Sequence, residues 1–301
     1  MTFPLVPRGR IVGLAFGAMR SARKGAGSDV TGTRPYVQGD PFRSINWSAS
    51  ARLSAARDSD TFVLREHYAD EAPRVVVVAD RRPEMQLFPR GFPWLRKGEA
   101  QRAVIDLIRA SAIEAHGFLG YLDHGDGDGE PFWLPPQSQS LWEYLDREEE
   151  GAPFHAPAST IEDAFEFLLA HPRSVPAGTF VFVLSDFLAP PPLETWVRAL
   201  EHRWDVVPVV LQDPLWERSF PSVDGFVLDV ADVDGRAHEV HLTRADTRAR
   251  TRAHETRWTE LLESFERALL EPVVVESSDE SELLRAFLRW SELRQAGADT
   301  W

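Results

Sequence analysis

Two uninterrupted apolar runs that each end in an aspartate constrain the fold of this chain more than any other feature. The first run, residues 74–80, has the sequence RVVVVAD, and the second, residues 179–186, has the sequence TFVFVLSD. Because apolar residues do not alternate with polar ones, both runs predict strands that are buried on both faces. Such strands lie at the centre of a parallel sheet that helices cover on both sides.

The segments that follow these runs repeat the order of strand and then helix. Apolar residues within 97–115 recur mostly at spacings of three and four, which predicts a helix. Further strands are predicted at 118–122, 132–134, 206–211 and 272–276, and further helices at 138–146, 161–169, 193–202, 244–270 and 279–294. This alternation predicts an α/β fold with a doubly wound, mostly parallel sheet of the Rossmann type.

An antiparallel hairpin is predicted as an insertion at about residues 223–241. Its two apolar stretches flank Asp234 and Gly235, and an Asp-Gly pair suits the tight turn of a hairpin. We therefore expect an α/β domain over residues 71–296, preceded by a basic segment at residues 1–70.

Charge is distributed unevenly along the 301 residues. The net charge is −14, but residues 1–60 carry +5 and the remainder carries −19. The acidic body argues against nucleic acid as a partner of the chain. The chain contains no cysteine, which excludes disulfides and thiolate chemistry and is typical of a reducing compartment. These features predict a cytoplasmic protein.

One short apolar stretch, residues 11–19, raises the question of export or membrane insertion. It is shorter than the roughly 20 residues that a membrane-spanning helix needs. Arg20, Arg23 and Lys24 follow it at once, where an export signal has small neutral residues. We therefore expect no direct membrane insertion.

The aspartates that end the two central runs mark the candidate functional site. Open parallel sheets bind ligands beyond the carboxyl ends of their strands, where Asp80 and Asp186 are expected. Thr160, just before the helix predicted at 161–169, can join them, and all three offer the hard oxygen ligands that Mg²⁺ or Ca²⁺ prefers. The alternative interpretation is structural, with the two carboxylates capping helices or pairing with arginines.

This arrangement resembles the von Willebrand factor A fold and its metal-ion-dependent adhesion site. In that family a strand ends in Asp, a later Thr opens a helix, and a second strand ends in Ser-Asp. The first loop of the family has the pattern Asp-x-Ser-x-Ser, whereas residues 80–84 here are DRRPE. Arg82 and Glu84 therefore replace the two serines that coordinate the metal.

The replacements predict a degenerate metal site. Arg82 brings a fixed cation without an acceptor, and we expect it to pair with Asp80 or Asp186 where the metal would stand. Glu84 is a carboxylate that can still bind a cation. We expect no cofactor, and the alternative is Mg²⁺ held by Asp80, Glu84, Thr160 and Asp186.

A motif upstream carries a second resemblance. Residues 36–47 are YVQGDPFRSINW, followed by Ala51-Arg52 and by Leu64-Arg65-Glu66. This resembles the signature of the family named domain of unknown function 58. There a Gly-Asp-x-x-Arg-x-Ile-Asp-Trp motif and a Val-Arg-Glu strand precede a von Willebrand factor A-like domain. Asn46 stands where the family has Asp, which removes a charge but keeps the shape.

Two interpretations of this motif stay open. In the first it is an architectural corner, in which Gly39 and Asp40 form a tight turn and Trp47 buries its ring. In the second it is a docking face for an acidic partner, because arginine and tryptophan are enriched at interface hot spots. The residues of that face are Arg34, Arg43, Arg52, Arg57 and Trp47.

The second resemblance also implies a function. Members of that family look like partners of MoxR-type AAA+ ATPases, which act in the assembly or metal loading of other complexes. It implies a non-enzymatic adaptor or co-chaperone that binds the ATPase and a client protein. The predicted partner-binding residues are Asp80, Arg82, Glu84, Thr160, Asp186, Arg43, Trp47 and Arg52.

Enzymatic alternatives have weaker support in the sequence. No glycine-rich phosphate loop with a lysine is present, and Ser185 lacks the glycine-flanked turn of a hydrolase nucleophile. We therefore predict that the chain is not an enzyme. Two alternatives remain, a divalent-metal-dependent ligand-binding domain and a metal-dependent hydrolase that uses Asp80 and Asp186.

Overall fold

A six-stranded sheet organises the larger part of the molecule in the computed structural model. The model describes residues 1–8, 14–24, 30–37, 42, 45–57, 62–86, 95–127, 129–136, 153–222, 224–231 and 237–298. The strands of this sheet, in spatial order, are β11 (Val273–Val275), β8 (Asp205–Leu211), β7 (Phe180–Ser185), β4 (Arg74–Ala79), β5 (Phe118–Asp123) and β6 (Phe132–Leu134). Five strands are parallel, and β6 runs antiparallel to β5 at one edge.

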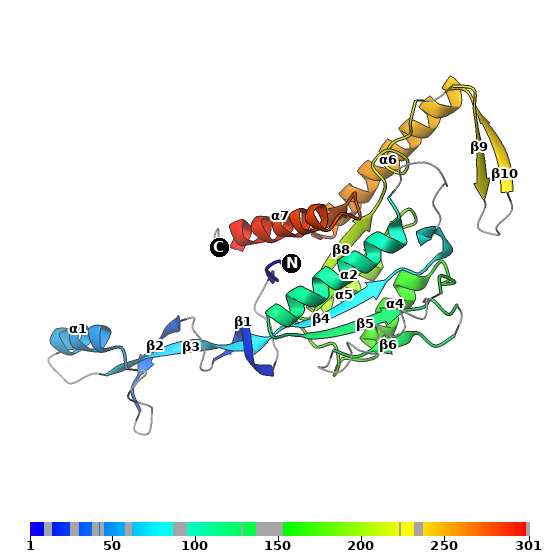
Figure 1. The fold of residues 1–301 in the computed structure, drawn as a ribbon. Coiled ribbons are helices and arrows are strands. Elements are labelled where there is room, and N and C mark those ends of the chain that lie inside the picture. The colour runs from blue at the N-terminus through cyan, green and yellow to red at the C-terminus, as the bar shows by residue number, and fades with distance from the viewer. Residues whose placement is uncertain are drawn as a thin grey trace.

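Helices cover both faces of this sheet (Figure 1). One face packs against α2 (Lys97–Glu114) and α7 (Glu280–Ala298). The other packs against α4 (Thr160–Leu169), α5 (Leu193–Glu201) and the C-terminal half of α6 (Arg244–Arg267). The predicted doubly wound, mostly parallel α/β fold is confirmed.

The central strands alternate their side chains between two cores, as strand geometry requires. In β4, Val75 and Val77 belong to the core under α2 and α7, whereas Val76 and Val78 belong to the core under α4 to α6. All four are buried. The unbroken apolar run in the sequence follows from this double burial.

The first residues of the chain join the core of the α/β part. Phe3 packs against Phe287 of α7 with a ring-centroid distance of 4.5 Å. Arg294 of α7 donates hydrogen bonds to the carbonyl oxygen of Val6 and to the buried carboxylate of Asp205. The chain start is therefore fastened to the last helix by packing and by a hydrogen bond.

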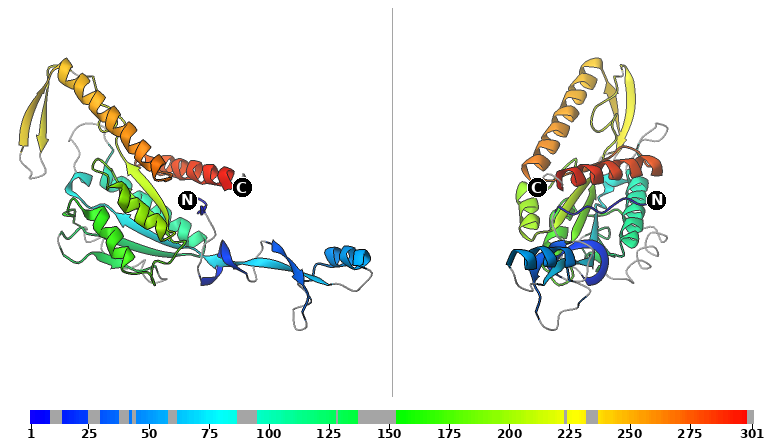
Figure 2. Two further views of the ribbon diagram at one scale, coloured as in Figure 1. Left: turned by 180° about the vertical axis from the view of Figure 1, so that it is seen from behind. Right: turned by 90° about the vertical axis from the view of Figure 1, so that its left-hand side faces the viewer.

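The rest of the N-terminal part forms a second, smaller sheet. Its strands are β1 (Leu14–Lys24), β2 (Val30–Pro35) and β3 (Val63–Ala72), all antiparallel, with β3 in the middle. Helix α1 (Trp47–Arg57) precedes β3. Figure 2 shows this sheet and α1 extending away from the α/β layers. Most of the apolar stretch at residues 11–19 therefore lies in β1.

The predicted hairpin is present as β9 (Phe226–Ala231) and β10 (Ala237–Leu242), which pair antiparallel. The turn with Asp234 and Gly235 lies outside the described residues, as does the helix predicted at 138–146. Helix α6 begins directly after β10, where Thr243 and Asp246 form a capping box. Among the described helices, none has both the length and the apolar character needed to cross a bilayer.

Candidate functional site

The candidate site lies at the carboxyl ends of β4 and β7. These neighbouring strands continue in opposite directions across the sheet, β4 to β5 and β7 to β8, which is the switch point where open α/β sheets bind ligands. Asp80 follows β4 and Asp186 follows β7, and each is 1% exposed. The two aspartates therefore lie together at the edge of the sheet formed by the carboxyl ends of its parallel strands, as expected from the sequence. We call this edge the rim.

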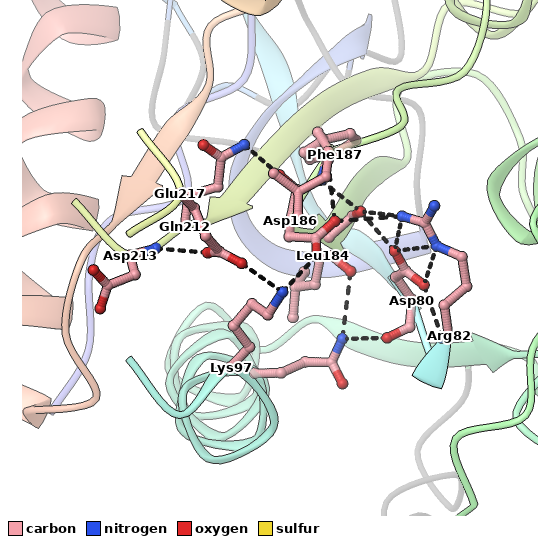
Figure 3. A network of polar contacts seen from close by, with 12 residues as sticks. Asp80, Arg82, Lys97, Leu184, Asp186, Phe187, Gln212, Asp213 and Glu217 are labelled. Carbon is pink, nitrogen blue, oxygen red and sulfur yellow. Dashed lines mark hydrogen bonds and ion pairs between the residues drawn. The ribbon is translucent and has the colours of Figure 1, made fainter. Parts of the chain in front are cut away.

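Arg82 occupies the space between the two carboxylates (Figure 3). Its Nε donates to both oxygens of Asp80 at 3.0 Å, and its Nη2 donates to Asp80 Oδ2 at 2.6 Å. The same Nη2 lies 3.5 Å from Asp186 Oδ1. Arg82 is only 6% exposed, so this is a buried, charge-assisted pairing.

Lys97 supplies a second cation from the opposite side. It is the first residue of α2, and its buried Nζ lies 2.6 Å from Asp186 Oδ2 and 2.8 Å from Glu217 Oε1. A cation in the first turn of a helix is disfavoured by the helix dipole. The two carboxylates offset that cost and hold α2 against the rim.

Neutral side chains complete the network. Ser185 Oγ donates to Asp80 Oδ2 at 2.6 Å, and Gln101 Nε2 donates to the carbonyl oxygen of Asp80 at 2.9 Å. Gln212 Nε2 donates to the carbonyl oxygen of Asp186. The oxygens of both aspartates are thus held by donors from α2, from β7 and from the loops after β4 and β8.

The pKa values of the two cations show the strength of this pairing. Burial alone lowers the pKa of Arg82, but the hydrogen bond and charge of Asp80 outweigh it, so the pKa is raised. Burial likewise lowers the pKa of Lys97, and the charges of Asp186 and Glu217 reverse the effect and raise it. Both side chains therefore stay protonated at neutral pH.

Arg81, the neighbour of Arg82 in sequence, turns toward the next strand. Its Nε lies 4.0 Å from Asp123 at the end of β5, and its Nη2 donates to the Tyr121 hydroxyl at 3.0 Å. Its guanidinium also lies over the ring of Phe154 at 4.6 Å. The two consecutive arginines thus pair with acids at the ends of three strands.

Thr160 and Glu84 stand apart from this network. Thr160 opens α4 and is buried, but its hydroxyl makes no hydrogen bond within the described part of the chain. Glu84 lies on the short helix η2 (Pro83–Met85), and its Oε2 is buried without a hydrogen-bond partner among the described groups. Its negative charge contributes to the raised pKa of Arg82.

The residues at the rim do not fit a divalent metal ion. Asp80 and Asp186 already bind Arg82 and Lys97, and an ion between them would have to displace both cations. Across the described ranges, no three His, Asp or Glu side chains are grouped as metal ligands. Asp80, Glu84 and Asp186 therefore do not form such a group of ligands.

The upstream motif surrounds the start of α1. Asn46 Oδ1 accepts a hydrogen bond from the backbone N–H of Ala49 at 3.2 Å, so it caps the helix as an aspartate would. Ile45 is buried and bridges to Leu64, and Ser50 Oγ accepts from the backbone N–H of Val63. These contacts fix α1 against β3.

Trp47 corrects one prediction made from the sequence. The ring expected to be buried at an architectural corner is 61% exposed. Among the described rings it meets the edge of Phe62, with a centroid distance of 6.1 Å. Ile45 and Ser50 hold the helix in the described part of the chain. Gly39, Asp40 and Arg43 of the same motif lie outside the described residues.

Several aromatic rings form one exposed surface beside α1. Phe42 is 70% exposed and stacks on Tyr36 at 5.8 Å, and Tyr36 meets the edge of Phe62. Trp47 continues the series through its contact with Phe62. We call Tyr36, Phe42, Trp47 and Phe62 the aromatic surface. Arg52 is exposed on the next turn of α1.

The chain matches a known protein family over most of its length. The family model described as "Protein of unknown function DUF58" matches residues 32–260, which includes α1, the rim and most of the α/β layers. The chain belongs to the DUF58 family. This match confirms the family expected from residues 36–66.

Two solved structures are similar to this DUF58 protein. One is an aerotolerance-related membrane protein from Bacteroides fragilis, with 15% identity and a TM-score of 0.44, covering 73% of this chain and 99% of that chain. The other is the conserved hypothetical protein BatB from Bacteroides thetaiotaomicron, with 14% identity and a TM-score of 0.43, covering 74% of this chain and 99% of that chain. No curated protein matches the chain. Family membership therefore rests on residues 32–260.

The sequence interpretation missed several partners in the rim network of this DUF58 protein. Lys97, Gln101, Gln212 and Glu217 come from α2 and from the segment after β8. One signal was present for Lys97, because a lysine that opens a helix needs an acid nearby. The other three give no signal, since their partners lie far away in the sequence.

Proposed function

We propose that this DUF58 protein is a non-enzymatic adaptor that binds other proteins in the cytoplasm. In this proposal it works with a MoxR-type AAA+ ATPase in the assembly or maturation of a client complex. The observation that carries the proposal is the aromatic surface. Its rings lie side by side in contact with solvent, and contiguous exposed apolar patches of this kind mark interaction sites.

The composition of this surface supports a protein partner. Tryptophan, tyrosine and arginine supply most of the binding energy at protein interfaces, and Trp47, Tyr36 and Arg52 lie within one short region. The contacts of Ile45 and Ser50 already hold α1, and Phe42, Trp47 and Phe62 remain exposed. Docking there would bury them without any rearrangement of the helix.

The rim has a different part in the proposal. Its carboxylates are held by Arg82 and Lys97, so neither is a free general base or metal ligand. Of the rim residues predicted to bind a partner, Asp80, Arg82, Thr160 and Asp186 are buried and only Glu84 is partly exposed. We therefore propose that the ion cluster fixes the loop after β4 and that Glu84 alone offers a charge for docking.

Binding to a MoxR-type AAA+ ATPase of the same organism tests the proposal. We expect Trp47→Ala to weaken binding by about 2 kcal/mol or more, roughly 30-fold, as for an interface hot spot. Leu293→Ala is the matched control, because Leu293 is an exposed apolar residue on α7. No binding by the wild-type chain at low salt, or an equal loss in both variants, would contradict the proposal.

A further inference from the structure

The N-terminal half of α6 is a polar helix that stands clear of the α/β layers (Figure 1). Within residues 244–257 only Thr247 is buried, whereas Leu261 and Phe265 anchor the other half in the core. A helix that is polar on all sides usually bridges to another surface. The sequence of this half indicates what that surface is.

This half of the helix is a basic region on an acidic body. Residues 244–257 contain five arginines and two acids, a net charge of +3, although residues 61–301 together carry −19. Three of the arginines have partners within the chain. Arg244 pairs with Asp224 at 2.8 Å, Arg250 lies over the ring of Phe220, and Arg257 donates to the carbonyl oxygen of Glu217.

Arg248 and Arg252 are the exceptions. Both are exposed, and within the described part of the chain neither pairs with a carboxylate, since Arg252 Nε donates only to the carbonyl oxygen of Arg248. They are one turn apart on the same side of α6, where like charges destabilise a helix. The chain has 47 acidic residues and places none of those described within pairing distance. The two cations are therefore open to an external anion.

A surface hollow of about 430 Å³ lies beside these two arginines, lined by Ser222, Thr247, Arg248, Thr251 and Arg252. The Ser222 side chain is exposed, and its hydroxyl makes no hydrogen bond to the described groups. The hollow thus offers two guanidiniums and a free hydroxyl, all of which can donate hydrogen bonds. This chemistry suits carboxylate oxygens better than any neutral or cationic group.

The spacing of the arginines favours an extended acidic chain. Arg248 and Arg252 are four residues apart in α6, so they are separated by about 6 Å along the helix axis. Side chains on one face of an extended segment recur every two residues, about 6.6 Å apart. Two acids separated by one residue therefore match the two guanidiniums. A long nucleic acid is disfavoured, because it would bring many phosphates close to the acidic body, whereas a short acidic segment places its charges only at the site.

We propose that Arg248, Arg252 and Ser222 bind an extended acidic segment of a partner protein, with acids two residues apart facing the two arginines. This site lies on α6, away from the aromatic surface of α1. It adds a second binding site to the proposed adaptor, and its test needs no ATPase, so the two proposals can fail separately.

Fluorescence anisotropy with a labelled peptide of alternating Glu and Ser tests the site on the full chain. We expect binding that weakens with added salt, and a loss of at least about tenfold in the variant Arg248→Glu/Arg252→Glu. The variant Arg267→Glu/Arg285→Glu has the same charge change at exposed positions of α6 and α7 and should stay within about twofold of wild type. Circular dichroism of both variants confirms that they are folded.

Five outcomes would overturn the proposal. The first three are no binding by the wild-type chain, equal losses in both variants, and equal binding of a peptide in which Gln replaces Glu. The fourth is binding of a single-stranded oligonucleotide as tight as that of the acidic peptide, which would identify a nucleic-acid surface instead. Light scattering distinguishes a last alternative, since a dimer that Arg248→Glu/Arg252→Glu dissociates would make a second copy the occupant and would also refute the proposal.

Discussion

Arginines in two regions of this molecule differ in burial and in pairing. At the rim, Arg82 is buried between two aspartates and donates to both. On α6, Arg248 and Arg252 are exposed and pair with no acid in the described part of the chain. The rim cation is part of the internal structure, whereas the cations on α6 remain available to another molecule. The same residue type thus stabilises the fold in one place and offers binding in the other.

The largest expected effect is the loss of stability when the buried arginine, Arg82, is replaced. Replacing Arg82 by Met leaves Asp80 without its main partner in a site closed to solvent. We expect the free energy of unfolding to fall by about 3–5 kcal/mol, the cost of breaking a buried ion pair from one side. Urea denaturation followed by circular dichroism measures the loss.

An exposed ion pair provides the control for that experiment. Arg198 and Glu166 pair at 3.3 Å with both side chains more than half exposed. Arg198→Met should cost about 0–1 kcal/mol, the usual range for surface pairs. Similar losses in Arg82→Met and Arg198→Met would show that the rim cluster does not hold the fold together.

A double-mutant cycle at Lys97 and Asp186 should give a smaller effect. Lys97→Met leaves Asp186 with Arg82 as its remaining ion-pair partner, and Asp186→Asn leaves Lys97 with Glu217, whereas the double variant removes both charges of the pair. We expect the double variant to lose less stability than the sum of the two single losses, with a coupling of about 0.5–3 kcal/mol. Additive losses would mean that the 2.6 Å contact between these groups contributes nothing specific.

The smallest predicted effect concerns pH. Burial lowers the pKa of His124, against the opposing charges of Asp163 and Asp123, so the folded state binds a proton less readily than the unfolded state. The stability from neutral His124 is complete above the unfolded value of about 6.5 and is lost as pH falls through the lower folded pKa. Thermal unfolding between about pH 7.5 and 5 should therefore show decreasing stability.

His124→Gln should flatten this decrease, while His155→Gln should leave it unchanged because His155 is exposed. Arg82 and Lys97 stay charged across the same window, since the pKa of each is raised. An unchanged slope in His124→Gln would assign the pH dependence to other groups, of which His254 is one, because burial also lowers its pKa.

The α/β layers could be predicted well because their central strands are recognisable from short stretches of sequence. Within β4 and β7, residues 75–79 and 180–184 are all apolar, since both faces of each strand are buried. Strand β3 lacks such a run, and its residues 67–72, HYADEA, give no alternation. Its place in a small antiparallel sheet was therefore missed, apart from the Leu64-Arg65-Glu66 strand that the family resemblance implied.

The candidate site likewise contains some residues that the sequence could predict and others that it could not. Asp80, Asp186 and the pairing of Arg82 could be inferred because strand ends meet at one rim in a parallel sheet. Glu217 could not, because its contact with Lys97 joins residues 120 positions apart. Only one of the two interpretations of the upstream motif placed Trp47 in the interior, and the structure leaves it exposed while Ile45 and Ser50 are buried beside α1.

The thermal stability of the wild-type chain with and without Mg²⁺ or Mn²⁺ tests the central claim most directly. If Arg82 and Lys97 hold the two aspartates, neither ion should raise the unfolding midpoint above that measured in a chelator. A divalent ion that bound the folded chain would raise the midpoint progressively with ion concentration, through a stabilisation of about 2.7 kcal/mol at 100 times its Kd. Such a rise, if Asp80→Asn abolished it, would show that a metal and not an arginine organises the rim.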